Sequence, residues 1–388
     1  MKIGYDISQT GAGKAGCGWF AASLLEALIA QGGDELELLL YPTFGDGFWD
    51  PGWSKSLRRP AAASCQFIRT PRSFHEASGF WKQTPDVLFE LLGSPDLIHS
   101  HNFYCPPRIP GVRLIYTFHE LSYLELPELT SEANRLTCFR GVYEAALRAD
   151  AVMANSSFSR DRFLACFPHF PEERVRVNHP ASRFPLNPTP NRVQSKLLPK
   201  LRSGEFWLSV GTLEPRKNHV GLMQAYAEAA RQRDLGPLVL AGGEGWLMEG
   251  LDDQIQSLGK GQILRVGYVE DVQLEWLYAN CRAFLYPSLY EGFGMPVLEA
   301  LSLGAPVIVS GTTSLPEIVA DSALLIDPQN TASIREAILR MDSDEGLRRK
   351  LRLAGKKRAQ QFQWEDSARR IMELYRWTLD HPPRCRMK

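Results

Sequence analysis

Short apolar segments alternate with helical patterns along the whole chain. In the first half, the segments that predict strands are residues 2–7, 35–41, 65–70, 96–101, 113–119 and 151–156. In the second half they are residues 206–211, 238–242, 263–267, 283–287, 306–310 and 323–327. Strands that alternate with helices form parallel sheets covered by helices on their faces. The pattern therefore predicts an α/β protein in which both halves follow one plan.

The length of the chain predicts two domains, because 388 residues exceed the usual size of a single hydrophobic core. Residues 184–204 are rich in proline and polar side chains, which is typical of a linker. Helical spacing of apolar residues returns in the last segment, over 365–379. The predicted order is a first domain, a linker, a second domain and a closing helix, at residues 1–185, 186–204, 205–364 and 365–388.

Composition narrows the class of protein. Lys+Arg and Asp+Glu both number 44, so there is no global basic field to attract nucleic acid. No run approaches the roughly 18 apolar residues of a membrane span, and residues 1–20 lack a signal-peptide pattern. The seven cysteines are odd in number and widely spaced, as expected of reduced thiols. We expect a soluble cytoplasmic protein that does not bind nucleic acid.

The segment EGFGMPVLE, residues 291–299, carries the strongest chemical signal. It follows an apolar strand and leads into a helix, so Glu291 lies on a loop and Glu299 projects from about the first helical turn. The free N–H groups of a helix start, approached closely through the two glycines between these carboxylates, form an anion site. An anion site flanked by two carboxylates fits a sugar attached to a phosphate. In the plainer interpretation, Glu291 caps the helix and Glu299 is solvated.

A second segment, FWLSVGTLEPRKN at residues 206–218, places Arg216 and Lys217 after a strand and a glycine turn, at the start of the next helix. Two cations at a helix N-terminus are unfavourable to the helix itself, because the helix dipole is already positive there. A bound polyanion explains the pair better.

Together, GTLEPRKN and EGFGMPVLE resemble the retaining nucleotide-sugar glycosyltransferases of family 4, which have the GT-B fold. The resemblance covers most of the chain and includes an N-terminal glycine turn and residues 117–128, 153–161, 314–328 and 362–368. In particular, the chain is similar to the bacterial branch that adds mannose or similar sugars to surface polysaccharide. The resemblance implies two Rossmann-like domains that face each other across a cleft, with the C-terminal helix crossing back to the first domain.

The resemblance also implies the reaction: a hexose, by first expectation mannose from GDP-mannose, moves to a saccharide or lipid-linked saccharide acceptor. Glu291 would bind donor-sugar hydroxyls, and Glu299 would bind the nucleotide ribose. The implied catalytic residues are His119, Arg216, Lys217 and Glu291. The implied donor-binding residues are Gly16, Gly18, Gly211, Val269, Phe293, Gly294, Val297 and Glu299.

The glycine-rich start permits a competing interpretation. GAGKAG at residues 11–16 matches the dinucleotide fingerprint G-x-G-x-x-G, as in an NAD-dependent oxidoreductase. That motif expects an acidic residue at the end of the second strand, where this chain has Tyr41, Pro42 and Thr43. A Walker A motif also fails, since Ser8 and Ala15 occupy two of its required positions.

We instead predict a glycine turn at residues 16–18, before a helix of roughly residues 19–30. In the family, such a turn brings its backbone to the donor phosphates, and a basic residue and Tyr commonly follow. Here Trp19 and Phe20 follow, which leaves phosphate contact to the backbone. Lys14 either compensates or is simply solvated.

His119 ends a predicted strand, at the carboxyl edge where open α/β sheets bind ligands. In the family, this histidine lies beside the transferred sugar and is usually followed by Asp, where this chain has Glu120. A half-buried structural histidine is the alternative. Glu120 is the nearest candidate for a covalent nucleophile, but a front-face reaction is favoured, in which the leaving phosphate takes the acceptor proton.

Two patterns could hold a metal. His99 and His101 alternate on one strand face, but no third ligand is evident. A D-x-D pattern at residues 342–344 lies just before a helix, where a capping role is favoured. We therefore predict no metal and no other cofactor.

Two surfaces leave membrane association open. Residues 44–85 interleave aromatic and basic side chains, which indicates either an acceptor or membrane surface or local packing. A basic run at residues 348–358 is either a solvated helix surface or a contact with anionic lipid at the inner face of the membrane. A GT-B hydrolase or epimerase and a catalytically dead scaffold are the remaining alternatives.

Overall fold

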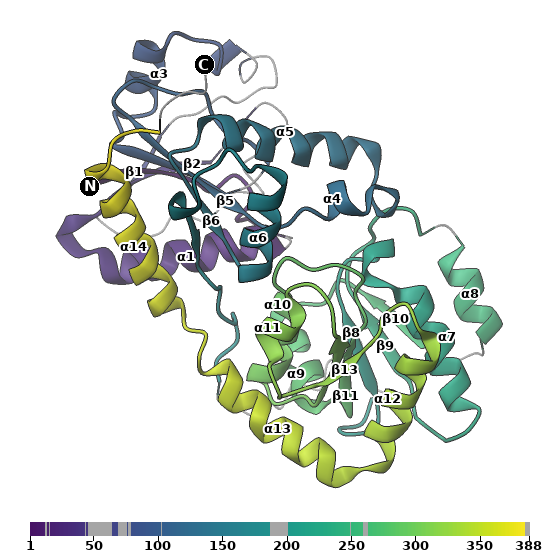
Figure 1. The fold of residues 1–388 in the computed structure, drawn as a ribbon. Helices are drawn as coiled ribbons and strands as arrows, with labels where there is room; N and C mark the ends of the chain where they lie inside the picture. Colours follow the sequence, from purple (N-terminus) through teal and green to yellow (C-terminus); the bar gives the residue numbers. More distant parts are fainter. Residues whose placement is uncertain are drawn as a thin grey trace. The chain divides into compact units, whose positions relative to one another are not determined.

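In the computed structural model, the chain divides into two compact units. The structure describes residues 1–11, 14, 16–42, 44–45, 64–68, 76, 79–101, 103–186, 201–248, 250–258 and 263–384. Unit 1 comprises Met1–Leu124, Glu132–Pro180 and Gln363–Lys388, and unit 2 comprises Glu125–Ser131 and Ala181–Phe362. Each unit contains its own parallel sheet (Figure 1). Each also has its own hydrophobic core.

Unit 1 contains a seven-stranded parallel sheet in the order β3-β2-β1-β4-β5-β6-β7. Its strands are β1 (Lys2–Asp6), β2 (Glu37–Tyr41), β3 (Cys65–Phe67), β4 (Leu97–Ser100), β5 (Arg113–Phe118), β6 (Ala151–Ala154) and β7 (Val175–Val177). The strand order reverses between β1 and β4, and the loops at the carboxyl ends of strands beside such a switch point are the usual ligand site of an open α/β sheet.

The helices of this part of the chain are α1 (Gly16–Gly32), α3 (Pro85–Leu91), α4 (Ser122–Glu125), α5 (Glu132–Arg148), α6 (Ser157–Cys166) and α14 (Trp364–Asp380). Short 3-10 turns occur at Gly33–Glu35, Pro127–Leu129 and Glu172–Arg174. The closing helix α14 packs along α1 within unit 1 (Figure 1). It buries Ile371, Leu374 and Tyr375, which have helical spacing.

Unit 2 contains a six-stranded parallel sheet in the order β10-β9-β8-β11-β12-β13. Its strands are β8 (Trp207–Val210), β9 (Leu238–Ala241), β10 (Ile263–Gly267), β11 (Ala283–Tyr286), β12 (Val307–Ser310) and β13 (Leu324–Ile326). Its helices are α7 (His219–Ala230), α8 (Leu251–Leu258), α9 (Asp271–Asn280), α10 (Met295–Ser302), α11 (Leu315–Val319), α12 (Thr331–Ser343) and α13 (Glu345–Ala359), with a 3-10 turn at Pro215–Lys217.

The predicted strands are all present, although most are shorter than predicted and residues 69–70 lie outside the described residues. Strand β7 was not predicted, because its three residues are too few to show a period. Of the predicted linker, residues 187–200 are likewise outside the described part. The D-x-D pattern is a helix boundary, because the Asp344 side chain accepts a hydrogen bond from the Leu347 N–H at 2.8 Å.

The predicted glycine turn at residues 16–18 was wrong, since α1 already begins at Gly16. Gly18 is nevertheless required by packing: a Cβ at this position would lie 2.1 Å from the carbonyl oxygen of Gln9. The missing side chain lets the first turn of α1 press against the loop after β1.

The aromatic segment 44–85 is described only in part. Within it, Trp81 is buried and packs edge-to-face on Phe44, with ring centroids 5.2 Å apart. Trp81 also lies 5.1 Å from the Tyr104 ring. These members belong to local packing, as the alternative interpretation held, while Phe48, Trp49, Trp53 and the arginines of the segment lie outside the described residues.

Candidate functional site

A buried cluster of charges in unit 2 joins the loop after β8 to the loop after β11. The Lys217 ammonium lies 2.5 Å from Glu291 Oε1, and Arg216 Nη1 lies 3.2 Å from Glu291 Oε2. Arg216 also pairs with Glu214 at 2.5 Å, and Lys217 donates a hydrogen bond to the Tyr286 hydroxyl at 2.8 Å. The sequence segments GTLEPRKN and EGFGMPVLE are thus in direct contact, and both cations act on one carboxylate.

The local backbone explains how the two cations reach Glu291. Pro215 opens a 3-10 turn over Pro215–Lys217, and Asn218 then takes a left-handed conformation with φ 56°. Helix α7 begins only at His219. Arg216 and Lys217 therefore lie on a separate turn before the helix, which corrects the prediction that they start it. This turn points both side chains toward β11 instead of along the axis of α7.

Glu291 is held by its main chain as well as by its carboxylate. Its N–H donates to the Thr313 hydroxyl at 3.2 Å, and its carbonyl accepts from the Ser314 hydroxyl at 2.9 Å. Gly294 caps α10 with φ 98°, and a Cβ there would lie 2.5 Å from a methyl carbon of Leu315. Only glycine fits this conformation and this space, so Gly294 fixes the way in which the loop enters α10.

The pKa of Glu291 reflects this surrounding. Burial by itself would raise the pKa, but Lys217 and Arg216 outweigh burial and hold it well below the usual range. Because Glu291 is only 6% exposed, its charge depends on these partners and not on water. The cluster is therefore a fixed set of ion pairs around the Glu291 carboxylate, which stays ionised at neutral pH.

Glu299 has a different set of partners. Its Oε1 lies 2.9 Å from Arg183 Nε, and its Oε2 accepts a hydrogen bond from the Tyr278 hydroxyl at 3.1 Å. Arg183 also pairs with Asp271 at 3.1 Å. Burial raises the pKa of Glu299 and prevails over the opposing effect of Arg183. The two motif carboxylates thus differ in electrostatics: the pKa of Glu291 is lowered and that of Glu299 is raised.

The remaining predicted donor-binding positions occur in both units. Gly16 and Gly18 lie in the first turn of α1, in unit 1. Gly211 follows β8, Val269 follows β10, and Phe293 and Val297 are buried around the start of α10. The Val297 side chain is fully buried, so any polar contact from this residue is made by its backbone.

His119 follows β5 in unit 1, at the carboxyl edge of the sheet as predicted. Its Nε2 donates to the His101 carbonyl at 3.0 Å, and the Phe20 ring meets it edge-to-face at 5.5 Å. Burial would lower the pKa of His119, but the Cys17 side chain, the His101 carbonyl and Glu120 together raise it. His119 is therefore a fixed, protonatable group. The Glu120 carboxylate accepts a hydrogen bond from Ser122 at 2.7 Å.

His99 and His101 form a buried hydrogen-bonded chain and are not arranged as a metal site. His99 Nδ1 lies 2.7 Å from the Tyr375 hydroxyl, and its Nε2 lies 2.8 Å from Thr117 Oγ1. Thr117 Oγ1 is in turn 3.2 Å from His101 Nδ1. Burial lowers the pKa of His99 to about 3 and also lowers that of His101, so both rings are neutral. Throughout the described ranges, no group of three or more His, Cys, Asp or Glu side chains could hold a metal ion.

Three partners in these clusters were not found from the sequence. Arg183 and Tyr278 hold Glu299, yet they come from segments far from the motif and carry no local pattern. Tyr286 lies within an apolar strand, where its hydroxyl looked like part of the core. For Tyr286, the contact with Lys217 follows from the parallel pairing of β8 and β11, which aligns the carboxyl ends of the two strands.

Comparison with known proteins gives the family. The model of glycosyltransferase family 4 matches residues 16–181, and that of the group 1 glycosyl transferases matches residues 194–358. The O-antigen chain mannosyltransferase B of Escherichia coli is 35% identical over 287 residues, which cover 72% of this chain and 74% of that protein.

Two solved structures share the fold. Sucrose-phosphate synthase from Thermosynechococcus elongatus has a TM-score of 0.72 at 21% identity, covering 97% of this chain and 99% of its own. HepE of Anabaena, solved in complex with UDP-glucose, has a TM-score of 0.69 at 20% identity, covering 97% of this chain and 100% of its own. The chain belongs to the family 4 glycosyltransferases and has the GT-B fold. It is an enzyme that transfers a glycosyl group from a nucleotide sugar.

Proposed function

We propose that this enzyme moves a mannosyl residue from GDP-mannose to a saccharide or lipid-linked saccharide, with retention of the anomeric configuration and without a metal ion. The choice of mannose is supported by the E. coli relative, an O-antigen chain mannosyltransferase. The observation that carries the catalytic proposal is the buried pairing of Lys217 and Arg216 with Glu291.

The proposed role of the two cations follows from charge. When the bond between the sugar and the diphosphate breaks, negative charge grows on the departing diphosphate. Fixed cations in a buried site stabilise such charge strongly, because they need no reorganisation as the reaction proceeds. Lys217 and Arg216 supply this stabilisation, together with the positive end of the α10 dipole. With positive charge built into the protein, a metal ion would duplicate their role.

Glu291 and Glu299 receive separate roles in the proposal. Glu291 stays ionised and buried, so it is a strong acceptor for donor-sugar hydroxyls. Glu299 is the acceptor for the ribose hydroxyls, with Arg183 and Tyr278 keeping its side chain in place.

Retention is proposed to follow a front-face route, in which the departing phosphate takes the proton of the acceptor hydroxyl. A covalent route would need a carboxylate nucleophile close to the anomeric carbon. Glu120, the nearest such candidate by sequence, is engaged by Ser122. In the front-face route, the enzyme contributes charge stabilisation and orientation and takes no proton itself.

The decisive experiment is a melting-shift screen with GDP, UDP, ADP and dTDP, followed by incubation with GDP-mannose and mannosylated acceptors. The proposal expects the largest stabilisation by GDP and an α-linked product by NMR. A larger shift with another nucleotide would mean that the donor sugar is carried by that nucleotide and not by GDP. Release of free mannose at the same rate with and without acceptor would make the enzyme a hydrolase.

A further inference from the structure

Helix α5 of unit 1 carries an exposed apolar stripe. Leu136 is 57% exposed, Phe139 39%, Tyr143 45% and Leu147 39%. Their spacing of three, four and four residues places all four on one side of the helix. The Phe139 and Tyr143 rings stack on each other with centroids 5.6 Å apart, although both side chains are exposed to solvent. The stripe extends over about 17 Å of helix, and contiguous apolar surface of this kind marks an interaction site.

Basic residues accompany the stripe. Arg135 and Arg140 lie on α5 beside it, and Arg148 ends the helix. The carboxylates of α5 are Glu132 at its start and Glu144, which pairs with Arg148 at 2.7 Å. α5 thus carries three arginines and two glutamates, and one of these glutamates is paired with Arg148.

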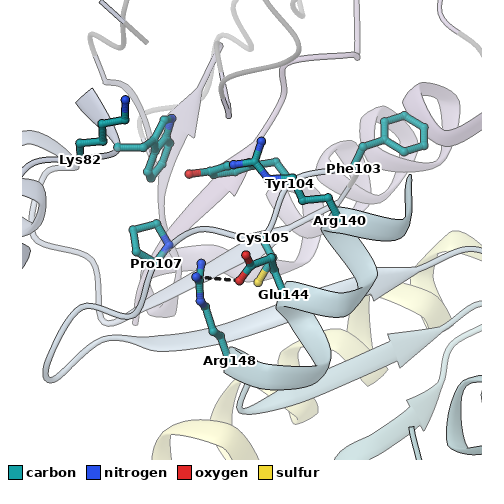
Figure 2. Close-up of a pocket in the computed structure, with 10 residues that line it drawn as sticks. Lys82, Phe103, Tyr104, Cys105, Pro107, Arg140, Glu144 and Arg148 are labelled. Carbon is teal, nitrogen blue, oxygen red and sulfur yellow. Dashed lines mark ion pairs between the residues drawn. The ribbon is translucent and has the colours of Figure 1, made fainter. Parts of the chain in front are cut away.

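A pocket of about 210 Å³ opens on the flank of the same helix. Arg140, Glu144 and Arg148 of α5 form one wall, and the loop of residues 103–107 with Lys82 forms the other (Figure 2). A second pocket of about 390 Å³ continues from it, sharing Arg148 and including Leu147 of the stripe. The apolar stripe is thus continuous with hollows that are lined by cations.

We propose that this face of α5 docks on an anionic lipid bilayer. The stripe enters the outer acyl region, and lipid phosphate groups contact Lys82, Arg140 and Arg148. An amphipathic helix with arginines beside its apolar side binds in this way, and each basic residue near an anionic surface strengthens the attraction. Guanidinium groups suit phosphate because they donate two parallel hydrogen bonds.

The bilayer is favoured over a protein partner by the combination of the two features. An apolar stripe alone would fit another helix, and a basic pocket alone would fit a free phosphate. Their continuity along one helix fits a surface whose apolar interior lies beneath a layer of phosphates. This inference rests on the proposed function in one respect: a lipid-linked acceptor would be met at such a surface.

The test measures binding of the full chain to vesicles by co-sedimentation, using phosphatidylcholine alone and phosphatidylcholine mixed with phosphatidylglycerol. The stripe variant is Leu136→Ser with Phe139→Ser, and the charge variant is Arg140→Glu. Matched controls are Leu353→Ser and Arg349→Glu on α13, where the two residues are 66% exposed and 73% exposed at the side chain. These controls also test the basic run of α13 as a rival membrane surface.

We expect the wild type to bind the anionic vesicles and to bind phosphatidylcholine much more weakly. Arg140→Glu should weaken binding at least about five-fold, and the stripe variant about ten-fold or more. The α13 controls should bind as the wild type does. All variants should keep their melting temperature and their transfer to a water-soluble oligosaccharide acceptor.

Several results would overturn the proposal. These are absence of binding to anionic vesicles, equal binding to both vesicle types, or equal losses in the α13 controls. If the wild type is dimeric in sedimentation velocity and the stripe variant is monomeric, the occupant is a second copy of the chain. Failure of the wild type to transfer sugar would count against the proposed function alone, because vesicle binding is measured without donor or acceptor.

Discussion

Lys217 and Glu291 form a buried ion pair at 2.5 Å, although they lie on loops that follow different strands. Lys217 is 11% exposed and Glu291 7% exposed at the side chain, so water contributes little to either charge. Removing one partner from such a pair leaves an uncompensated buried charge, which is more costly than removing both. The pair therefore matters for stability as well as for the proposed reaction.

Lys217→Ala should lower kcat about 10²–10³-fold, because one fixed charge facing the departing diphosphate is lost. Steady-state kinetics with the identified donor and acceptor measure this, and Lys357→Ala on the exposed surface of α13 is the matched control. Turnover close to that of the wild type would remove Lys217 from the catalytic set.

Lys217→Ala should also lower the free energy of unfolding of unit 2 by up to about 3 kcal/mol, because Glu291 then keeps only Arg216 as a paired cation. Adding Glu291→Gln to this variant should recover part of the loss, since the carboxylate with too little compensation becomes a neutral amide. Urea unfolding of the two single variants and the double variant measures the coupling. If the effects of the two substitutions simply add, the pair makes no net contribution to stability.

Glu299→Ala should weaken binding of the free nucleoside diphosphate, whereas Glu291→Ala should leave that affinity nearly unchanged and impair transfer. The reason is the proposed division between ribose and sugar contacts. Isothermal titration of each variant with the nucleotide compares the two affinities directly. Equal losses of affinity would refute the division.

Transfer should persist in excess EDTA, because Arg216, Lys217 and the start of α10 supply the positive charge that a metal would bring. Product formation before and after chelation gives the answer, with added Mg²⁺ or Mn²⁺ as the control. If transfer is lost completely and either metal restores it, a metal ion and not these residues stabilises the leaving group.

Acid should destabilise unit 1 through His99. Burial lowers its pKa from 6.5 to about 3, so the unfolded chain binds a proton that the folded chain excludes. The stability that neutral His99 contributes is full above pH 6.5 and is lost as the pH falls toward 3. Between these values, one such group contributes a slope of about 1.4 kcal/mol per pH unit. His99→Asn should reduce the slope of the unfolding free energy against pH by this amount, as measured by urea unfolding between pH 6 and 5. An unchanged slope would show that His99 does not cause the acid sensitivity.

The sequence was most informative where chemistry is local. The glycines and carboxylates of residues 291–299 share one loop and one helix start, so their spacing alone predicted the loop and the helix that follows it. Arg183 could not be found in this way, because it meets Glu299 only after distant segments fold together. The exposed stripe on α5 escaped notice for another reason. A helical period shows that a face is apolar, but not whether another element covers it.

The first turn of α1 also shows a limit of sequence patterns, here in the interpretation of glycine. Gly18 lies in a tight place because of the Gln9 carbonyl and not because of a turn, whereas a Cβ at Gly16 would meet nothing within 4 Å. Pattern alone does not distinguish a glycine chosen for its backbone angles from one chosen for its lack of a side chain. The neighbouring atoms decide between the two.

The membership of α14 in unit 1 has a consequence for synthesis on the ribosome. Domains usually fold in the order in which they emerge, but the hydroxyl that completes the hydrogen bonds of His99 belongs to Tyr375. The main segment of unit 2, Ala181–Phe362, is therefore synthesised before the unit that was begun first can complete its core. Until α14 emerges, the surface of α1 that it contacts stays uncovered in the growing chain.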